Sequence, residues 1–172
     1  QVQHFKWPSL EKFKNPISEF IPVARISDML LQPGKVFSYN GNEIKYPDIK
    51  LVYWAGGNPF HHQMNLKKLI KAFKQPDTII VNEIWWNSLA RHADIILPAT
   101  TSLERNDISI KHWDQTISPM YKAIEPIGES KSDYEIFSEI SSKLNFKDKF
   151  TEGKDEDKWL KFIWEEARDK AK

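Results

Sequence analysis

Apolar and polar positions in the middle of the chain follow the order expected for alternating strands and helices. Three short, almost continuously apolar runs predict strands at Leu51–Trp54, Thr78–Val81 and Asp94–Leu97. Helical spacing predicts a helix over Asn65–Phe73 between the first two strands and a shorter one over Asn87–His92 before the third. Parallel strands need such crossovers. The stretch therefore predicts a βαβαβ unit, half of a doubly wound sheet, with its strands covered on both faces.

The segments before this unit predict a helix and a hairpin. A stripe of apolar residues favours a helix that begins near Pro22 and stops at Gln32-Pro33-Gly34. Residues 36–47 then place two alternating runs on either side of Asn40-Gly41-Asn42, and Asn-Gly in that setting is the strongest short-range hairpin signal. We expect this hairpin to be a peripheral addition to an α/β body.

The segments after the unit are more polar. Residues 98–120 have no helical period and predict a loop, with an edge strand as the alternative. A helix is predicted from Ser132 or Asp133 to Leu144, because this serine fits an N-cap before an amphipathic run. A charged spacer over residues 147–157 leads to a last amphipathic helix.

These elements divide the chain into three predicted parts. Residues 1–21 form an irregular arm, residues 22–146 an α/β domain, and residues 147–172 the charged spacer with the C-terminal helix. The predicted fold class is α/β, a Rossmann-like three-layer domain around a small parallel sheet of about three to four strands.

Composition narrows the classes of partner. The 172 residues include 25 basic and 24 acidic side chains, a net charge of +1, so no global field favours nucleic acid or an anionic membrane. The absence of cysteine excludes disulfides, thiolate catalysis and cysteine-ligated zinc or iron–sulfur clusters within the chain. No apolar run approaches the roughly 20 residues that span a bilayer, so membrane insertion is not expected. The chain does not begin with Met, which favours a processed product or an excised fragment.

The most informative stretch is LVYWAGGNPFHH, residues 51–62, in which an apolar strand ends at two glycines. A glycine turn between a strand and a helix presents backbone N–H groups to an anion, and open α/β sheets bind ligands at this end of their strands. The turn is not the G-x-G-x-x-G fingerprint, so an NAD site is weakly supported. His61 and His62 are either hydrogen-bond donors that face a ligand or half-exposed turn residues. Zinc binding is the weakest reading, because no third ligand of matching spacing is present.

Polar residues also follow the other two strands. Glu83 comes just after the second strand, where an acid can accept from a ribose or a base edge; a surface carboxylate is the alternative. Arg105 and Asp107 follow the third strand, where the guanidinium suits a phosphate and the carboxylate can orient it. A purely structural ion pair is the alternative. Asp94 starts the third strand at the opposite end, so we assign it a structural role.

Four runs of the sequence resemble one family. They are IPVARISDMLLQPGK (Ile21–Lys35), YPDIKLVYWAGGNPFHHQ (Tyr46–Gln63), ARHADIILPATTSLERNDI (Ala90–Ile108) and SDYEIF (Ser132–Phe137). The chain resembles the molybdopterin oxidoreductases of the dimethyl sulfoxide reductase type, near the trimethylamine N-oxide and biotin sulfoxide reductases. The ADIILP segment is shared more widely in the family, whereas ERND and PVARISDMLL point to the S- and N-oxide reductase branch.

The resemblance implies a fragment of a bacterial oxidoreductase. In that branch a much longer catalytic chain holds molybdenum between two molybdopterin guanine dinucleotides, and the domain over residues 22–146 is similar to the internal part that contacts one of them. The implied activity is reduction of biotin sulfoxide, trimethylamine N-oxide or dimethyl sulfoxide by oxygen-atom transfer. The chain would supply no catalytic residue and no metal ligand, and it would be inactive alone. The cofactor, molybdenum bis(molybdopterin guanine dinucleotide), would be bound only in the full-length protein.

Site residues carry over by motif position. The residues that the resemblance implies as cofactor contacts are Gly57, Asn58, His62, Glu83, Arg105 and Asp133. Asn58 and His62 correspond to pterin or diphosphate contacts, and Glu83 to a guanosine contact. Met64 and Asn65 stand where a glutamine and an aspartate are expected. A thioether cannot replace the two-sided hydrogen bonding of an amide.

The alternative function is a non-catalytic nucleotide- or cofactor-binding module that retains the fold. The partners that the resemblance implies are the rest of the same polypeptide, a small S-oxide or N-oxide substrate and an electron-donor protein. A fragment also predicts exposed apolar surface at Trp85, Trp86 and Trp113, through which the chain can dimerise. The expected location is the bacterial periplasm, with the cytoplasm as the alternative.

Overall fold

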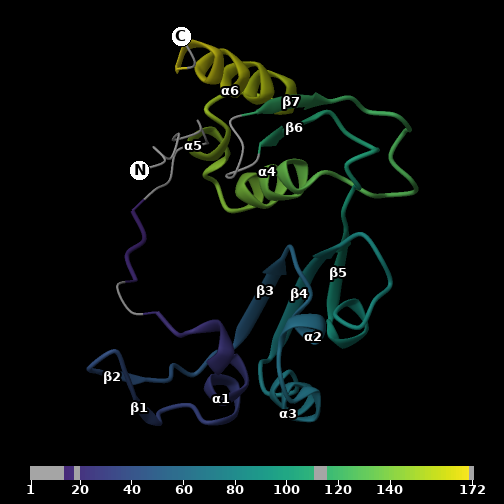
Figure 1. Ribbon diagram of the computed structural model, residues 1–172. Helices are drawn as coiled ribbons and strands as arrows, with labels where there is room; N and C mark the ends of the chain where they lie inside the picture. Colours follow the sequence, from purple (N-terminus) through teal and green to yellow (C-terminus); the bar gives the residue numbers. More distant parts are fainter. Residues whose placement is uncertain (1–13, 18–19, 111–115, 171–172) are drawn as a thin grey trace. The chain divides into compact units, whose positions relative to one another are not determined.

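The computed structural model describes residues 14–17, 20–110 and 116–170 (Figure 1). The chain divides between Leu97 and Pro98 into two compact units, which we call the N-terminal unit and the C-terminal unit. The predicted domain over residues 22–146 spans this division, and its bounds stay a prediction. The predicted arm over residues 1–21 lies mostly outside the described residues.

The N-terminal unit contains the predicted parallel sheet, which confirms the α/β fold class. Its strands are β3 (Leu51–Ala55), β4 (Thr78–Glu83) and β5 (Ile95–Pro98), in the order β3-β4-β5. β3 and β4 pair in parallel, from Leu51 opposite Thr78 to Ala55 opposite Asn82. Only β4 is largely buried, whereas β3 and β5 are partly exposed. The expectation that all three strands are covered on both faces is therefore wrong for β3 and β5, whose residues are exposed or only half-buried.

Two crossovers connect the strands. The chain passes from β3 through a short helix, α2 (Pro59–His62), and then through α3 (Leu66–Ala72), which confirms the predicted helix. Between β4 and β5 the predicted helix over Asn87–His92 is a single 3-10 turn, η2 (Ala90–His92). The Asn87 Oδ1 atom accepts from the backbone N–H groups of Leu89 and Ala90, as an N-cap does. The turn ends after His92 because Ala93 is already extended, with a ψ of 152°.

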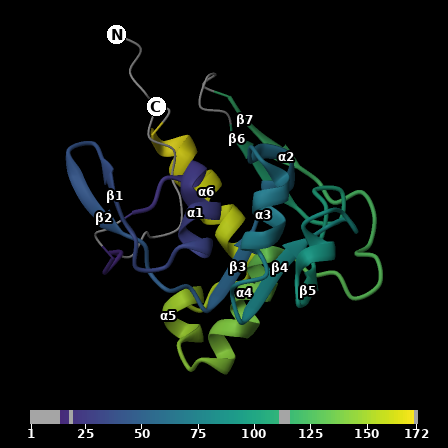
Figure 2. The same cartoon turned by 90° about the horizontal axis from the view of Figure 1, so that it is seen from below.

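The start of the N-terminal unit contains the predicted helix and hairpin. The helix is shorter than predicted: a 3-10 turn, η1 (Val23–Arg25), follows Pro22, and α1 runs only over Ile26–Leu31. Arg25 has a ψ of 3°, which separates the two segments. The hairpin is confirmed as β1 (Val36–Tyr39) and β2 (Asn42–Lys45), which stand apart from the sheet in both views (Figures 1 and 2). Asn40 and Gly41 form its turn with positive φ at both positions, as a type I′ turn requires.

The core of the N-terminal unit lies between α1, α3 and the sheet. Its residues are Leu30, Phe60, Leu69, Ala72, Phe73, Ile79, Val81 and Leu89. α1 and α3 are also joined by charge, because the Asp28 carboxylate accepts hydrogen bonds from Lys68 of α3 and from Arg25. The hydrogen bond from Lys68 is the main reason that the pKa of Asp28 is lowered.

In its described residues, the C-terminal unit contains a second hairpin and three helices. β6 (Asp107–Ile110) pairs with β7 (Ile117–Met120) in antiparallel register. The predicted loop is therefore confirmed only before Asp107, and the alternative of a strand applies to the second half of residues 98–120, where two strands pair. α4 (Asp133–Lys143) is confirmed, and Ser132 caps it in a capping box with Glu135.

The last two helices complete the C-terminal unit. They are α5 (Lys147–Thr151) and α6 (Glu156–Lys170). α5 lies inside the predicted charged spacer. The many charged residues of α5 obscure its helical pattern in the sequence. In the structure its Phe150 ring stacks against the Tyr134 ring of α4, with centroids 5.7 Å apart. Across the described part of the chain, no helix has the length and apolar character that a bilayer span requires.

We expect Asp28→Asn to lower the free energy of unfolding by about 1 kcal/mol at neutral pH, because Lys68 would keep its charge without a partner. A lowered pKa means that the carboxylate stabilises the fold above its ordinary pKa. This contribution is lost as the pH falls through the lowered value, below about 4. In urea unfolding, the difference between wild type and variant should therefore be large at neutral pH and narrow towards about pH 3.

Asp48→Asn is the matched control, because Asp48 forms an ion pair with Lys50 at the surface. The side chains of Asp48 and Lys50 are 62% and 64% exposed. An exposed pair contributes little, so this variant should unfold like the wild type. Equal effects of the two substitutions would show that Asp28 does not join α1 to α3.

Candidate functional site

The turn after β3 exposes its backbone, because Gly56 and Gly57 have no side chains that would cover it. Gly56 and Gly57 have φ values of 81° and 71°, and no atom lies within 4 Å of the place where a Cβ would stand on either residue. Both residues are exposed, at the carboxyl end of the strand. The turn thus has the features that allow a ligand to approach the main chain closely.

Asn58 fixes the way the chain leaves this turn. Its side chain is the N-cap of α2, where Oδ1 accepts from the Phe60 N–H at 3.0 Å, and Pro59 occupies the first helical position. The residue is 8% exposed, and its Nδ2 atom donates to the Ser88 Oγ atom at 3.3 Å. The amide of Asn58 therefore has a structural role, and its contact to a cofactor stays a prediction.

The two histidines lie at the end of α2 and are both exposed. The next residue but one, Met64, is 85% exposed. Asn65 adopts the left-handed conformation and caps α3, since its Oδ1 atom accepts from the Lys68 N–H at 3.1 Å. Asparagine tolerates that backbone and caps a helix as well as the expected aspartate does, so this departure leaves the local structure intact. The contact predicted at His62 is not tested by this geometry.

Glu83 ends β4 and turns back on its own chain. Its Oε1 atom accepts from the backbone N–H groups of Ile84 at 2.9 Å and Trp85 at 3.4 Å. Trp85 and Trp86 are each 67% exposed, as predicted for surface that another part of the protein covers. Trp113 lies outside the described residues.

The parallel pairing of β3 and β4 brings part of the predicted site together at the carboxyl end of the sheet. Ala55 is opposite Asn82, so the glycine turn and Glu83 leave neighbouring strands at the same end of the sheet. Asp94 lies at the other end, where its carboxylate accepts from the Ile79 N–H at 2.8 Å, which confirms its structural role. Four predicted contacts, at Gly57, Asn58, His62 and Glu83, thus belong to the N-terminal unit.

The other two predicted contacts, Arg105 and Asp133, belong to the C-terminal unit. Arg105 donates from Nε and Nη2 to one oxygen of Asp107, at 3.2 and 2.9 Å, and from Nη1 to the Thr100 carbonyl oxygen at 2.9 Å. Three of its five N–H groups are therefore engaged within the loop. The ion pair fits both alternatives, an oriented phosphate ligand and a purely structural contact. Asp133 is the exposed first residue of α4.

Glu104 organises this loop, whereas the sequence indicates only that it belongs, with Arg105 and Asp107, to a polar loop after the third strand where cofactor contacts are expected. Its carboxylate is 4% exposed and accepts from the Thr101 N–H and hydroxyl at 2.7 Å each and from the Ile127 N–H at 2.8 Å. The hydrogen bonds from Thr101 are the main reason that the pKa of Glu104 is lowered. The spacing of Thr101 and Glu104 is that of a capping box, and this pattern is a signal that could have identified the residue.

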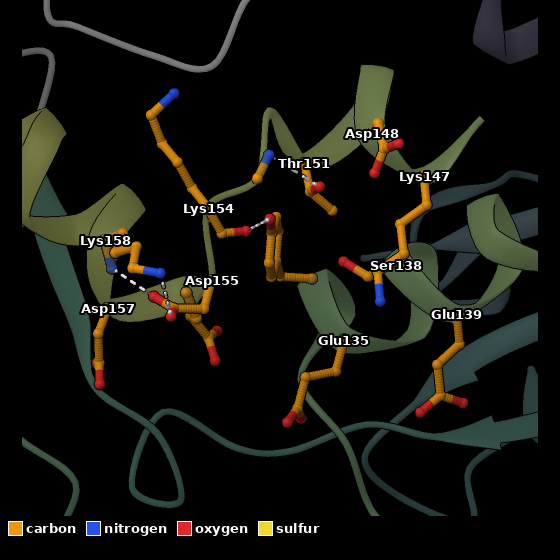
Figure 3. A pocket seen from close by; sticks show the side chains of 13 residues that line it. Glu135, Ser138, Glu139, Lys147, Asp148, Thr151, Lys154, Asp155, Asp157 and Lys158 are labelled. Atoms are coloured by element: carbon orange, nitrogen blue, oxygen red, sulfur yellow. Dashed lines mark hydrogen bonds and ion pairs between the residues drawn. The ribbon is translucent and has the colours of Figure 1, made fainter.

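A cavity of about 630 Å³ lies elsewhere in the C-terminal unit, between α4, α5 and the start of α6 (Figure 3). Its lining includes three lysines and six carboxylates: Lys147, Lys154, Lys158, Glu135, Glu139, Asp148, Asp155, Glu156 and Asp157. Burial raises the pKa of Glu156. None of the predicted contacts lines this cavity, and its excess of acidic groups suits a pyrophosphate poorly. Within the described ranges, no group of three or more His, Asp and Glu side chains is arranged to hold a metal ion.

Comparison with solved structures supports the fold described above. Acetylene hydratase from Pelobacter acetylenicus matches 59% of the chain and 14% of its own length, with a TM-score of 0.53 and 20% sequence identity. At this identity the similarity shows the α/β fold alone. The family model for molybdopterin oxidoreductases matches residues 10–143, and the chain belongs to that family.

The curated relatives carry more specific names. The chain is 49% identical to the biotin sulfoxide reductase of Cereibacter sphaeroides over 96% of its length and 22% of that protein. It is 50% identical to the trimethylamine-N-oxide reductase of Haemophilus influenzae over 85% of its length and 18% of that protein. A dimethyl sulfoxide/trimethylamine N-oxide reductase of Rhodobacter capsulatus is 47% identical over 88% of the chain and 19% of that protein. The chain thus spans about a fifth of the length of these relatives, which confirms the resemblance to part of a longer enzyme.

We expect Glu104→Gln to weaken the link between the loop that precedes β6 and the loop that follows β7. A glutamine offers one acceptor oxygen, so at least one of the donors at Thr101 and Ile127 would face an NH₂ group instead. Hydrogen exchange at these two backbone amides should become faster. In the wild type the same change should appear when the pH falls through the lowered pKa of Glu104.

Glu129→Gln is the control for this prediction, because Glu129 is an exposed residue of the same segment. The control should leave exchange at Thr101 and Ile127 unchanged. Protection that survives in Glu104→Gln would mean that the carboxylate does not organise the loop.

Proposed function

We propose that the chain is the part of a molybdenum-dependent S- or N-oxide reductase that holds one guanine dinucleotide of the cofactor. The observation that carries the proposal is the bare Gly56-Gly57 turn at the carboxyl end of β3, in a chain that is about half identical to reductases of this kind. A side chain at either glycine would fill the space beside the main chain, so the turn fits close contact with an anionic group. When bound, the cofactor supplies the oxygen-atom transfer.

The residues of this chain bind and orient the cofactor. Gly57 offers main-chain contact, and Asn58 holds the turn while His62 lies exposed one helical turn later. Glu83 ends the neighbouring strand, where a carboxylate can accept from the hydroxyl or amino groups of guanosine. With these roles the chain would recognise the cofactor, and the cofactor would carry out the redox chemistry.

The C-terminal unit would contribute charge. Arg105 retains N–H groups beyond those bound to Asp107 and Thr100, and a guanidinium held by a carboxylate is well suited to a phosphate. Asp133 stands at the exposed start of α4, and it would be a further contact to the cofactor. The substrate would be a small S-oxide or N-oxide, as the names of the relatives indicate. Substrate and electron donor would meet parts of the protein beyond this chain.

A non-catalytic binding module with the same fold is the second candidate. It differs in one outcome: the full-length protein would bind molybdopterin guanine dinucleotide without reducing any S-oxide or N-oxide. Reduction of biotin sulfoxide, trimethylamine N-oxide or dimethyl sulfoxide by the molybdenum-loaded protein would exclude it.

Gly57→Ala in the full-length protein tests the turn. An alanine at positive φ costs about 1–2 kcal/mol and also places a methyl group beside the main chain. We expect the purified variant to contain much less molybdenum and releasable GMP per polypeptide than the wild type. Metal analysis and nucleotide chromatography measure both quantities without any assay of activity.

Gly128→Ala is the matched control, because Gly128 has a φ of 62°, is equally free of neighbouring atoms and lies outside the predicted site. The control carries the same backbone strain and should keep its cofactor. Equal losses in both variants would assign the effect to strain and remove the support that the turn gives to the proposal.

Arg105 and Asp107 distinguish a phosphate ligand from a structural ion pair. If Arg105 binds phosphate, Arg105→Gln should weaken GMP binding by the full-length apoprotein about tenfold or more, whereas Asp107→Asn should keep most of it. Titration calorimetry with GMP gives both affinities, and thermal unfolding of the apoproteins reports stability. Equal loss of stability in the two variants with unchanged GMP affinity would establish the structural alternative.

A further inference from the structure

The side chain of Asn58 can take only one orientation. The Phe60 N–H can only donate, so the amide oxygen of Asn58 must face it, at 3.0 Å. The amide nitrogen is then directed to the Ser88 hydroxyl at 3.3 Å, which must accept. Since Asn58 is 8% exposed, loss of the serine hydroxyl would leave a buried amide N–H without its partner. Ser88 therefore supports the side chain that caps α2.

The segment between β4 and β5, which contains Ser88, makes a second contact with α2 through His92. Its ring lies against the Phe60 ring, with centroids 4.4 Å apart and an angle of 23° between the planes. The Nδ1 atom of His92 is 2.7 Å from the carbonyl oxygen of Ser88, so this nitrogen carries the proton and donates. One hydrogen bond and one ring contact thus join the η2 segment to the segment that follows the glycine turn.

These two contacts connect the segments that follow two neighbouring strands, β3 and β4. The glycine turn follows β3 and the η2 segment follows Glu83 of β4, and both leave the sheet at the same edge. A turn with two positive-φ glycines is held only weakly by its own backbone, so its conformation depends on the residues that anchor it. On the near side, the Trp54 Nε1 atom donates to the Gly56 carbonyl oxygen at 2.9 Å. The anchor on the far side of the turn is Asn58, and the support of Asn58 is Ser88.

We propose that Ser88 is a positioning residue for the cofactor: its hydroxyl locks the Asn58 amide and so holds the Gly56-Gly57 turn in its ligand-binding conformation. The inference rests on the proposed function, because it assumes that this turn meets the cofactor. Ser88 acts through Asn58 and needs no contact with the ligand. Residues that support a binding group in this way commonly change affinity about 10–100-fold when they are replaced.

The experiment compares Ser88→Ala and Ser88→Thr in the full-length protein. The threonine keeps a hydroxyl that can accept from Asn58, whereas the alanine removes it. We expect Ser88→Ala to lower molybdenum and GMP retained after dialysis about tenfold, and Ser88→Thr to restore most of both. Ser118→Ala, at an exposed serine of β7, is the matched control and should behave as the wild type.

Thermal unfolding of the apoproteins separates positioning from stability. The inference expects Ser88→Ala to lose cofactor while the midpoint of its apoprotein stays within a few degrees of the wild type. Cofactor content that equals that of the wild type, or that falls only in proportion to the folded fraction, would overturn the role of Ser88 and leave the proposed function intact. A wild-type protein that contains no molybdenum and no GMP would overturn both.

Discussion

The parallel pairing of β3 with β4 is the constraint on which the candidate site depends. The carboxyl ends of parallel strands lie at the same end of a sheet. The register from Leu51 opposite Thr78 to Ala55 opposite Asn82 therefore brings the glycine turn beside Glu83. The pairing is held by the burial of β4, whose Ile79 and Val81 are almost completely enclosed. A shift in register would separate the two halves of the predicted site without changing any residue in it.

Much of this arrangement could be predicted from the sequence, because its signals are local. Three apolar runs identify the strands, Asn40-Gly41 identifies the hairpin turn, and Ser132 with Glu135 identifies the start of α4. Each of these signals acts through residues within a few positions of one another, so tertiary contacts had little opportunity to override it.

The errors arise where distant contacts decide the structure. β6 and β7 have short, mixed sequences, and each becomes a strand because the other is present. α5 is rich in charge, and its inward side is defined by the packing of Phe150 on Tyr134. The interactions of Glu104 with Ile127 and of Asn58 with Ser88 join residues 23 and 30 positions apart, so no local pattern identifies either pair. The pattern of the sequence identifies the glycine turn, Glu83 and Arg105 as candidates, whereas Asn58 and Asp133 come from the resemblance alone.

The two adjacent indoles after Glu83 have a practical consequence for the study of this protein. Trp85 and Trp86 are both mostly exposed, although they follow the most buried strand of the sheet. Indole fluorescence responds strongly to water, so these side chains form a built-in optical reporter next to the candidate site. Their emission would change when another part of the polypeptide, or a second copy of the chain, covers this surface. The chain therefore carries its own signal for the completeness of its assembly.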